Sequence, residues 1–263
     1  MTTWRADLLS AALRARGYRG IGRPLTLREQ TASTNDVARR IAAEGAPHGA
    51  TVVADTQTAG RGRAGRRWHS PPGSNLYLSS VLRLALPPEA IAPLALAVGL
   101  AVARASDELV GTGRAAVKWP NDVYLGERKL AGVLVEATTR AGGDTVLIAG
   151  VGVNVNARDF PDDFAVPATS LALAAGRDVD RNEAAAVLLH HLGDVVAAYA
   201  AAGVTSVVAD LRERDFLHSR RVRVEGVVGE ANGIDDAGRL VVRDDHGIHH
   251  FVLSGDVSWR GVS

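Results

Sequence analysis

The pattern of strand and helix signals along this chain changes near residue 217, and this change constrains the fold more than any other feature. Upstream, apolar segments with helical spacing alternate with runs typical of strands. Downstream, short strand-like runs are separated by turns such as D-D-A-G, a pattern typical of a small barrel. The sequence therefore predicts one domain over residues 1–216 and a second over residues 217–263, which a chain of 263 residues can accommodate.

The expected elements of the first domain are mixed in type. We expect helices at 4–16, from Ser33 to about Gly45, at 88–110, at 182–202 and at 204–216, and strands at 50–54, 75–84, 133–139 and 145–156. The last two strands flank Gly142-Gly143 and are expected to pair through a hairpin turn. Residues 57–75 contain so many turn-forming residues that we expect no regular structure there.

The glycine- and arginine-rich segment at 57–75 carries the first chemical signal. Its string G-R-G-R-A-G-R-R-W interleaves glycines with arginines and ends in Trp68. Glycine lets backbone amides approach an anion closely, and arginine donates paired, charge-assisted hydrogen bonds. The segment therefore predicts a site for a phosphate or a carboxylate beside a flat apolar wall. A solvated basic loop or an RNA-contacting loop fits the same composition, whereas the P-loop and Rossmann patterns do not.

The string K-W-P-N-D-V-Y-L-G-E-R-K-L-A-G, residues 118–132, carries the second signal. W-P-N-D predicts a turn after a strand, and the following residues predict a hairpin that returns Lys129 to that turn. Asn121 and Asp122 have oxygens of the kind that Mg²⁺ binds beside phosphates, although the two also fit an ordinary turn. Of the thirty basic residues only Lys118 and Lys129 are lysines, which suggests that a compact point charge is needed here rather than the fork of arginine.

Two further patterns offer groups to a ligand. Gly150 and Gly152 stand on one face of a strand, which leaves room for a flat group beside the sheet or for a closely packed helix. Ser33, Thr34 and Asn35 offer hydroxyl and amide groups to a buried polar ligand, and they also fit a helix N-cap.

Taken together, these strings closely resemble the biotin–protein ligases. The resemblance runs in the family order from about residue 31 to 156 through S-T-N-D, Q-T-A-G-R-G-R-A-G-R-R-W, G-S-N-L-Y-L-S, K-W-P-N-D-V-Y-L, R-K-L-A-G-V-L-V-E and G-V-G-V-N-V-N. It implies an α+β fold, in which a mixed sheet flanked by helices, akin to class II aminoacyl-tRNA synthetases, precedes an SH3-like barrel. It also implies a ligase that converts biotin and ATP, with Mg²⁺, to biotinyl-5′-adenylate. The biotin then passes to a lysine of the biotin carboxyl carrier domain of an acetyl-CoA or acyl-CoA carboxylase.

Position by position, the resemblance implies three groups of site residues and leaves metal ligands unassigned. The catalytic group is Lys129, Arg63 and Arg61. The biotin-binding group is Ser33, Thr34, Asn35, Gln57, Gly60, Arg61, Lys129, Gly132 and Gly150. The group that binds ATP or the adenylate is Arg63, Arg66, Trp68, Lys118, Asn121, Asp122 and Asn154.

Location and partners are expected as follows. Some family members carry an N-terminal winged-helix domain that binds DNA, but here the S-T-N motif starts at residue 33, so we expect a monofunctional ligase without specific DNA binding. The N-terminus has no signal-peptide pattern, and the apolar run from Ile91 to Ala103 is shorter than the roughly 20 residues that span a bilayer. We therefore expect a cytoplasmic protein that does not bind membranes. The net charge of +1 argues against nucleic-acid binding through bulk charge.

Two alternatives remain at this stage. A lipoate–protein ligase would share the fold and the chemistry but take a longer, linear acid, and such proteins lack the arginine-rich loop in this form. A nucleic-acid-binding module would use that loop without any enzymatic activity and would bind RNA in a salt-sensitive manner. It would not explain the presence of W-P-N-D and R-K-L-A-G.

Overall fold

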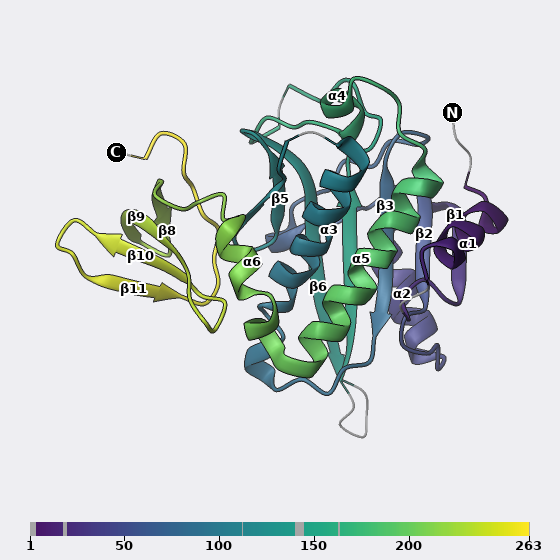
Figure 1. The fold of residues 1–263 in the computed structure, drawn as a ribbon, viewed down its shortest axis with the longest axis horizontal. Helices are drawn as coiled ribbons and strands as arrows, with labels where there is room; N and C mark the ends of the chain where they lie inside the picture. The colour runs from purple at the N-terminus through teal and green to yellow at the C-terminus, as the bar shows by residue number, and fades with distance from the viewer. Residues whose placement is uncertain (1–3, 18–19, 112, 140–144, 163, 263) are drawn as a thin grey trace.

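A mixed, seven-stranded sheet forms the centre of the molecule (Figure 1). The computed structural model describes residues 4–17, 20–111, 113–139, 145–162 and 164–262. The strands are β1 (Leu25–Thr31), β2 (Thr51–Gln57), β3 (Leu76–Leu82), β4 (Ala116–Lys118), β5 (Asp122–Leu125), β6 (Arg128–Thr139) and β7 (Thr145–Val153). Their order is β1-β2-β3-β7-β6-β5-β4, with β1 and β2 parallel and the other neighbours antiparallel.

Helices cover both faces of this sheet. On one face, α3 (Leu94–Val110) and α5 (Arg181–Ala202) pack side by side, and α1 (Ala6–Ala15) packs against α5 (Figure 1). On the other face, α2 (Thr34–Ala43) contacts β2, β3 and β7. The short helices α4 (Leu171–Ala175) and α6 (Val208–Glu213) lie in the connections around α5.

Side chains that alternate along β3 pack into two separate hydrophobic cores, one on each face of the sheet. Leu76, Leu78 and Leu82 belong to the large core under α3 and α5, while Val81 belongs to the small core under α2. Successive side chains of a strand point to opposite faces, so the buried Ser79 faces α2 with Val81. Ser79 therefore places a buried hydroxyl on the α2 face, while the equally buried Ser80 points to the opposite face, where its Oγ lies 2.8 Å from Thr51 Oγ1.

A second, four-stranded antiparallel sheet follows the helices. It contains β8 (Arg221–Val224), β9 (Val227–Ile234), β10 (Leu240–Asp244) and β11 (His249–Val252) in the order β11-β10-β9-β8. The Trp119 indole N–H donates to the Gly238 carbonyl at 3.1 Å. In addition, Phe216 packs between Tyr124 and Trp259, with ring centroids 4.4 Å and 5.0 Å away. These contacts join the two sheets.

The structure confirms the α+β class and most of the expected elements, and three local expectations are wrong. The helix expected at 88–110 is a 3-10 turn at Pro88–Ala90 followed by α3, with Pro93 as its N-cap. The helix expected at 204–216 ends at Glu213, because Val117 of β4 hydrogen-bonds the Arg214 carbonyl and the Phe216 amide. The last of the short strand-like runs expected after residue 217, D-V-S-W-R at residues 256–260, is reduced to a single bridge from Ser258 to Arg223.

Other expectations concern residues 57–75 and the turn at Gly142-Gly143. The turn lies outside the described residues, but β6, which precedes it, and β7, which follows it, pair with each other in antiparallel register. The segment 57–75 has more order than expected, as described below. The boundary between residues 216 and 217 stays a prediction.

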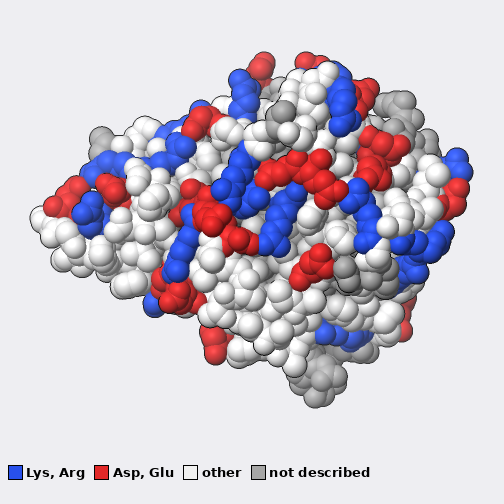
Figure 2. Space-filling view, in the orientation of Figure 1, with Lys and Arg blue, Asp and Glu red and all other residues white. Residues whose placement is uncertain are grey.

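Within the described part of the chain, two helical stretches are long and apolar enough to cross a membrane by length and composition, namely Pro88–Val110 and Arg181–Ser206. Both belong to the helical layer that covers the sheet, where packing in the core accounts for their apolar composition. Charged side chains of both signs are interleaved over the face seen in Figure 2, with no large area of a single sign.

Candidate active site

The glycine- and arginine-rich segment folds back on itself as a short hairpin above the α2 face of the sheet. The Trp68 amide donates to the Gly60 carbonyl at 2.9 Å, and the Gly62 amide donates to the Arg66 carbonyl at 2.7 Å. Arg61 and Arg67 face each other in an antiparallel bridge between these two contacts. The tip is a tight turn in which the Arg66 amide donates to the Arg63 carbonyl at 3.1 Å and Ala64 and Gly65 have positive φ angles of 52° and 72°, so this part of the loop has more order than expected.

Trp68 lies against two glycines of the central sheet. Gly132 and Gly152 are direct partners on β6 and β7. A Cβ atom on Gly152 would be 2.5 Å from the Trp68 indole, and one on Gly132 would be 3.0 Å from it. The flat group predicted beside the sheet is therefore the protein's own tryptophan in this structure. Gly152 was missing from the predicted site residues, although the spacing of Gly150 and Gly152 was the signal that could have included it.

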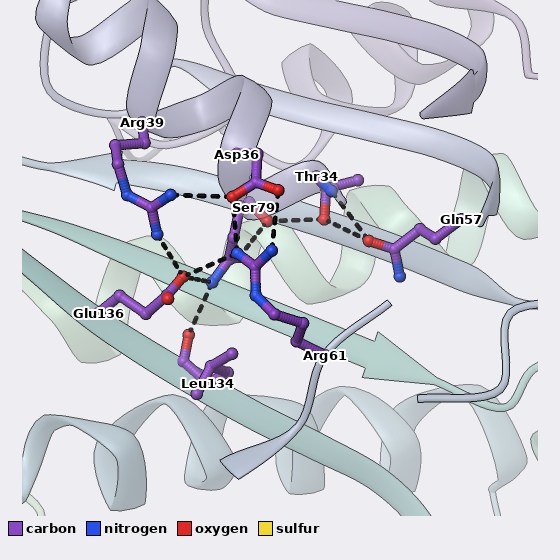
Figure 3. Close-up of polar contacts among 9 residues, drawn as sticks. Thr34, Asp36, Arg39, Gln57, Arg61, Ser79, Leu134 and Glu136 are labelled. Carbon is purple, nitrogen blue, oxygen red and sulfur yellow. Dashed lines mark hydrogen bonds and ion pairs between the residues drawn. The ribbon is translucent and has the colours of Figure 1, made fainter. Parts of the chain in front are cut away.

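A group of buried polar side chains lies where α2 begins (Figure 3). The Thr34 amide and hydroxyl donate to Gln57 Oε1 at 2.9 Å and 3.2 Å. Ser79 Oγ lies 2.7 Å from Thr34 Oγ1 and 2.5 Å from Asn35 Oδ1. The structure thus brings together the predicted residues Thr34, Asn35 and Gln57 and adds Ser79, whose signal was a serine within an apolar strand.

Ser33 occupies the N-cap position of α2, but its hydroxyl makes no capping hydrogen bond in the described part of the chain. The side chain is buried, with 3% of its surface exposed. Ser33 therefore stands at the N-cap position, as one of the two interpretations predicted, but its hydroxyl group does not cap the helix.

Gly150 permits the close approach of α2 to β7. A Cβ atom at this position would be 2.1 Å from Asn35 Oδ1. Gly60 is enclosed in a similar way, because a Cβ atom would be 2.8 Å from both Ser70 Oγ and the Trp68 carbonyl oxygen. Both glycines leave space for polar groups of the protein itself.

One row of residues across the sheet carries the charged part of the site. Lys118 pairs with Asp122, Asp122 with Gly132, and Gly132 with Gly152. Directly opposed residues share a face of the sheet, so the four positions point the same way. The row places Lys118 and Asp122 on the same face as the Trp68 indole.

Lys129 joins this row through an irregularity in the strand pairing. The register between β5 and β6 shifts after Val123, so that Tyr124 pairs with Lys129. Lys129 Nζ lies 2.7 Å from Asp122 Oδ1 and 5.5 Å from the centroid of the Trp68 ring. Strict alternation would place residues 129 and 132 on opposite faces, and the extra residue in the ladder removes this difference.

The two lysines differ in their surroundings. Lys118 is buried, with 7% of its surface exposed, and burial lowers the pKa of its ammonium group, while the Asp122 carboxylate partly opposes this change. The Lys129 side chain keeps 24% exposure. Lys129 is therefore the more accessible positive charge beside Trp68.

The four arginines of the loop are held differently. Arg61 pairs with Asp36 through two hydrogen bonds of 2.8 Å and 2.7 Å, and Arg66 pairs with Asp256 at 2.7 Å. Among the described residues, neither Arg63 nor Arg67 has an ion-pair partner, but Arg67 Nη2 donates to the Thr58 carbonyl at 3.5 Å. Arg63 is therefore the loop arginine best placed to receive an anion.

Asn121 and Asn154 use their amide groups within the protein. Asn121 Nδ2 donates to the Val133 carbonyl at 2.7 Å, and Asn154 Nδ2 donates to the Thr169 carbonyl at 3.0 Å. These bonds anchor the turn after β4 and the segment that follows β7. Their expected contacts with a nucleotide stay a prediction. Over the described ranges, the structure has no cluster of three or more histidine, aspartate or glutamate residues that could hold a metal.

Comparison with protein-family models matches two parts of the chain. Residues 27–156 match the biotin/lipoate A/B protein ligase family, and residues 220–260 match the biotin protein ligase C-terminal domain. The chain belongs to the biotin protein ligase family. The first match contains the residues of the candidate site described above, and the second contains all four strands of the second sheet.

Relatives and solved structures extend this match along the chain. The biotin–[acetyl-CoA-carboxylase] ligase of Mycobacterium tuberculosis is 37% identical over 244 residues, which cover 89% of this chain and 88% of the relative. The bifunctional ligase/repressor BirA of Salmonella typhimurium is 36% identical over 218 residues, covering 81% of this chain and 68% of the relative. The biotin protein ligase from Aquifex aeolicus in complex with biotin and ATP is 30% identical, with a TM-score of 0.77 and coverage of 90% and 98%. The expected fold of a class II synthetase-like catalytic domain with a small SH3-like domain agrees with these matches.

Proposed function

We propose that this biotin protein ligase joins biotin to ATP as biotinyl-5′-adenylate and then transfers the biotinyl group to a lysine of a biotin carboxyl carrier domain. One observation carries the proposal: Lys129 lies beside Trp68, which packs on the paired glycines Gly132 and Gly152. This arrangement combines a flat apolar wall with a positive charge at one edge. Such a site suits a ligand with an apolar ring system and an acid group.

The buried polar group at the start of α2 is suited to the ureido ring of biotin. A buried urea needs partners for one carbonyl and two N–H groups. Ser33 and Thr34 offer hydroxyl groups, while Gln57 and Asn35 offer amide groups, and all are at least half-buried. The amide and hydroxyl of Thr34 donate to Gln57 Oε1, so a ureido ring bound at these groups would exchange these hydrogen bonds for its own.

The activation step requires a stabilised negative charge. The carboxylate of biotin attacks the α-phosphorus of ATP, and pyrophosphate leaves. Lys129 is placed to stabilise charge on the carboxylate and the α-phosphate, and Arg63 to bind phosphate oxygens, because preorganised cations act strongly in a site with little water. Lys118 supplies a second positive charge from strand β4, which is separated from the strand of Lys129 by β5. Arg61 was predicted to be catalytic, and its pairing with Asp36 is taken up below.

The nucleotide side of the site is proposed to include Arg66, Trp68, Asn121, Asp122 and Asn154. Mg²⁺ bound to ATP would lower the charge repulsion between phosphates and carboxylate. Asp122 is an oxygen donor in this region and is paired with Lys129. In the transfer step the amine of the acceptor lysine attacks the biotinyl carbonyl carbon, an amide bond forms, and AMP leaves.

A direct experiment follows for the whole reaction. Incubation of the protein with biotin, MgATP and a purified carrier domain should add one biotinyl group to the carrier, as measured by mass spectrometry. Replacing biotin by lipoate is the matched control and should leave the mass unchanged. A gain of lipoyl mass without biotinyl mass would overturn the proposed substrate.

Two further parts of the proposal concern location and DNA. We place the ligase in the cytoplasm, where carboxylase acceptors are made, with no membrane partner. The net charge of +1 supports the absence of specific DNA binding. Specific operator binding by the purified chain would overturn the second part.

A further inference from the structure

Arg61 is held by a network of charged side chains on α2 and β6 (Figure 3). Its guanidinium donates two hydrogen bonds to the Asp36 carboxylate, at 2.8 Å and 2.7 Å, and lies 3.7 Å from Glu136. Arg39 bridges the same two carboxylates at 2.8 Å and 3.0 Å. Two positive and two negative charges therefore alternate in one half-buried cluster.

The cluster is connected to the buried polar group at the start of α2. Asn35 Nδ2 donates to Glu136 at 2.6 Å, while Asn35 Oδ1 lies 2.5 Å from Ser79 Oγ. Asn35 thus touches both the residues proposed to recognise the ureido ring and a carboxylate that faces Arg61. A ligand that engages Ser79 or Asn35 can alter the position of Glu136 through this single side chain.

The position of Arg61 in the loop makes this contact important for Trp68. Arg61 pairs with Arg67 across the hairpin stem, next to the hydrogen bond between Gly60 and Trp68. Fixing Arg61 therefore fixes the stem that carries the indole. Among the described residues, the other ion pair of this hairpin is Arg66 with Asp256, whose side chains are 59% and 53% exposed. Exposed pairs contribute little, so the cluster around Arg61 is the stronger attachment.

We propose that Asp36 and Glu136 are positioning residues that hold the glycine- and arginine-rich hairpin over the biotin site through Arg61. Arg61 is then itself a positioning residue that does not touch the reacting atoms. The inference deepens the proposed function and rests on it. Weakening the cluster should free the hairpin and let the biotinyl adenylate escape before transfer, while the chemistry at Lys129 continues.

The first test compares Asp36→Asn, Glu136→Gln and Arg61→Gln with the unchanged protein. Each should raise the dissociation rate of biotinyl adenylate by about tenfold, which is the effect expected from the loss of one half-buried ion pair. Each should also raise KM for biotin, while kcat for adenylate formation should change by less than about threefold. Glu44→Gln is the matched control, because it removes an exposed acidic charge at the end of the same helix. A large loss of kcat in Arg61→Gln with a normal Asp36→Asn would mean that Arg61 contacts the substrate, and would overturn the proposal.

The double variant Asp36→Asn/Arg61→Gln sharpens the comparison. If Asp36 acts through Arg61, the double variant should resemble Arg61→Gln, because the loss of Asp36 removes nothing further from a hairpin that already lacks the guanidinium. Multiplied effects would count against the proposal. Asp36→Glu keeps the carboxylate and should restore at least part of the slow dissociation.

A second measurement reads the hairpin without substrate. Hydrogen exchange at residues 60–68 of the ligand-free protein should be faster in Asp36→Asn than in Glu44→Gln. Equal exchange in the two would overturn the positioning role. This arm stands apart from the proposed function, because a protein that failed to make biotinyl adenylate would still show whether Asp36 holds the hairpin.

Discussion

At the scale of the residue, Lys129 should be needed for chemistry and not for folding. Lys129→Ala is expected to lower biotin-dependent pyrophosphate exchange by about 10²- to 10³-fold, because a preorganised charge is removed from the developing transition state. Lys129→Arg should not restore the rate, since a planar guanidinium cannot replace a compact ammonium group beside Trp68. Thermal unfolding of both variants is the control. Exchange near the normal rate in Lys129→Ala would show that the role is wrongly assigned.

Gly152 should tolerate no side chain. In Gly152→Ala the new methyl group would lie 2.5 Å from the Trp68 indole and displace it from the sheet. Overpacking of this kind typically costs 1–3 kcal/mol, so we expect biotin affinity to fall by about tenfold, as measured by calorimetry. Gly132→Ala is the matched comparison, and its effect should be smaller because the contact would be 3.0 Å. Equal affinities in all three proteins would contradict the packing argument.

The sequence singled out candidate site residues better than it indicated their partners. Thr34, Gln57, Lys129 and Trp68 stand in recognisable strings, and the structure pairs Thr34 with Gln57 and places Lys129 beside Trp68. Asp36 and Glu136 were missed because an acidic residue on a helix or a strand has no local signal when its arginine partner is distant in sequence. Such pairs depend on tertiary contact alone.

At the scale of the element, the contact between α2 and the hairpin should depend on pH only on the acid side. Hydrogen bonds from Arg61 hold the pKa of Asp36 below its ordinary value. Such a carboxylate stabilises the folded state above the unfolded pKa of about 3.9, and this contribution is lost as the pH falls through the folded pKa. In urea unfolding, Asp36→Asn should be less stable than the unchanged protein from pH 7 to about pH 5.

Below about pH 4 this difference in stability should shrink. Protonation of Asp36 removes its negative charge from the unchanged protein, and Asp36→Asn lacks that charge at every pH. Arg39 and Glu136 face the same group, so the comparison needs Glu136→Gln as a second variant. A difference that stays constant down to pH 3 would show that the Asp36 charge does not stabilise the fold.

The boundaries of helices and strands were predictable where local sequence, rather than tertiary contacts, determines them. The helix at α1 and the paired strands β6 and β7 follow from local periodicity. The end of α6 did not, because the backbone of Arg214 and Phe216 is used by β4, which lies far away in sequence. The register shift between β5 and β6 was equally hidden, although it decides which face Lys129 occupies.

At the scale of the whole molecule, the scarcity of lysine leaves few amines that an activated acid could acylate. Lys118 is buried and Lys129 is paired with Asp122. Guanidinium groups stay protonated and are poor nucleophiles, so surface arginines should not react with biotinyl adenylate. Introducing amines by Arg28→Lys and Arg40→Lys, both at exposed positions, should increase self-biotinylation severalfold by mass spectrometry. Arg40→Gln is the control, and equal labelling of all variants would refute the idea.

The sequence indicated a C-terminal part of short strands because its local pattern differs from that of the preceding residues, while the boundary after residue 216 stays a prediction. The contacts that join the parts were not visible. Trp119 stands in the W-P-N-D string, yet its indole N–H bonds the Gly238 carbonyl of the second sheet. A motif that was assigned to the nucleotide site therefore also connects the two sheets.

The row from Lys118 through Asp122 and Gly132 to Gly152 runs across the strands, in the direction of the backbone hydrogen bonds. Neighbouring strands are about 4.8 Å apart in every sheet, whatever their side chains. The spacing of the backbone strands therefore sets the distance between Lys118 and the glycines on which Trp68 packs. Substitutions elsewhere can accumulate over long evolutionary times without changing this scale, and insertions in the connecting loops leave it intact. Substitution of side chains leaves the separation of about 4.8 Å between neighbouring strands unchanged, so the relative positions of these site residues are kept.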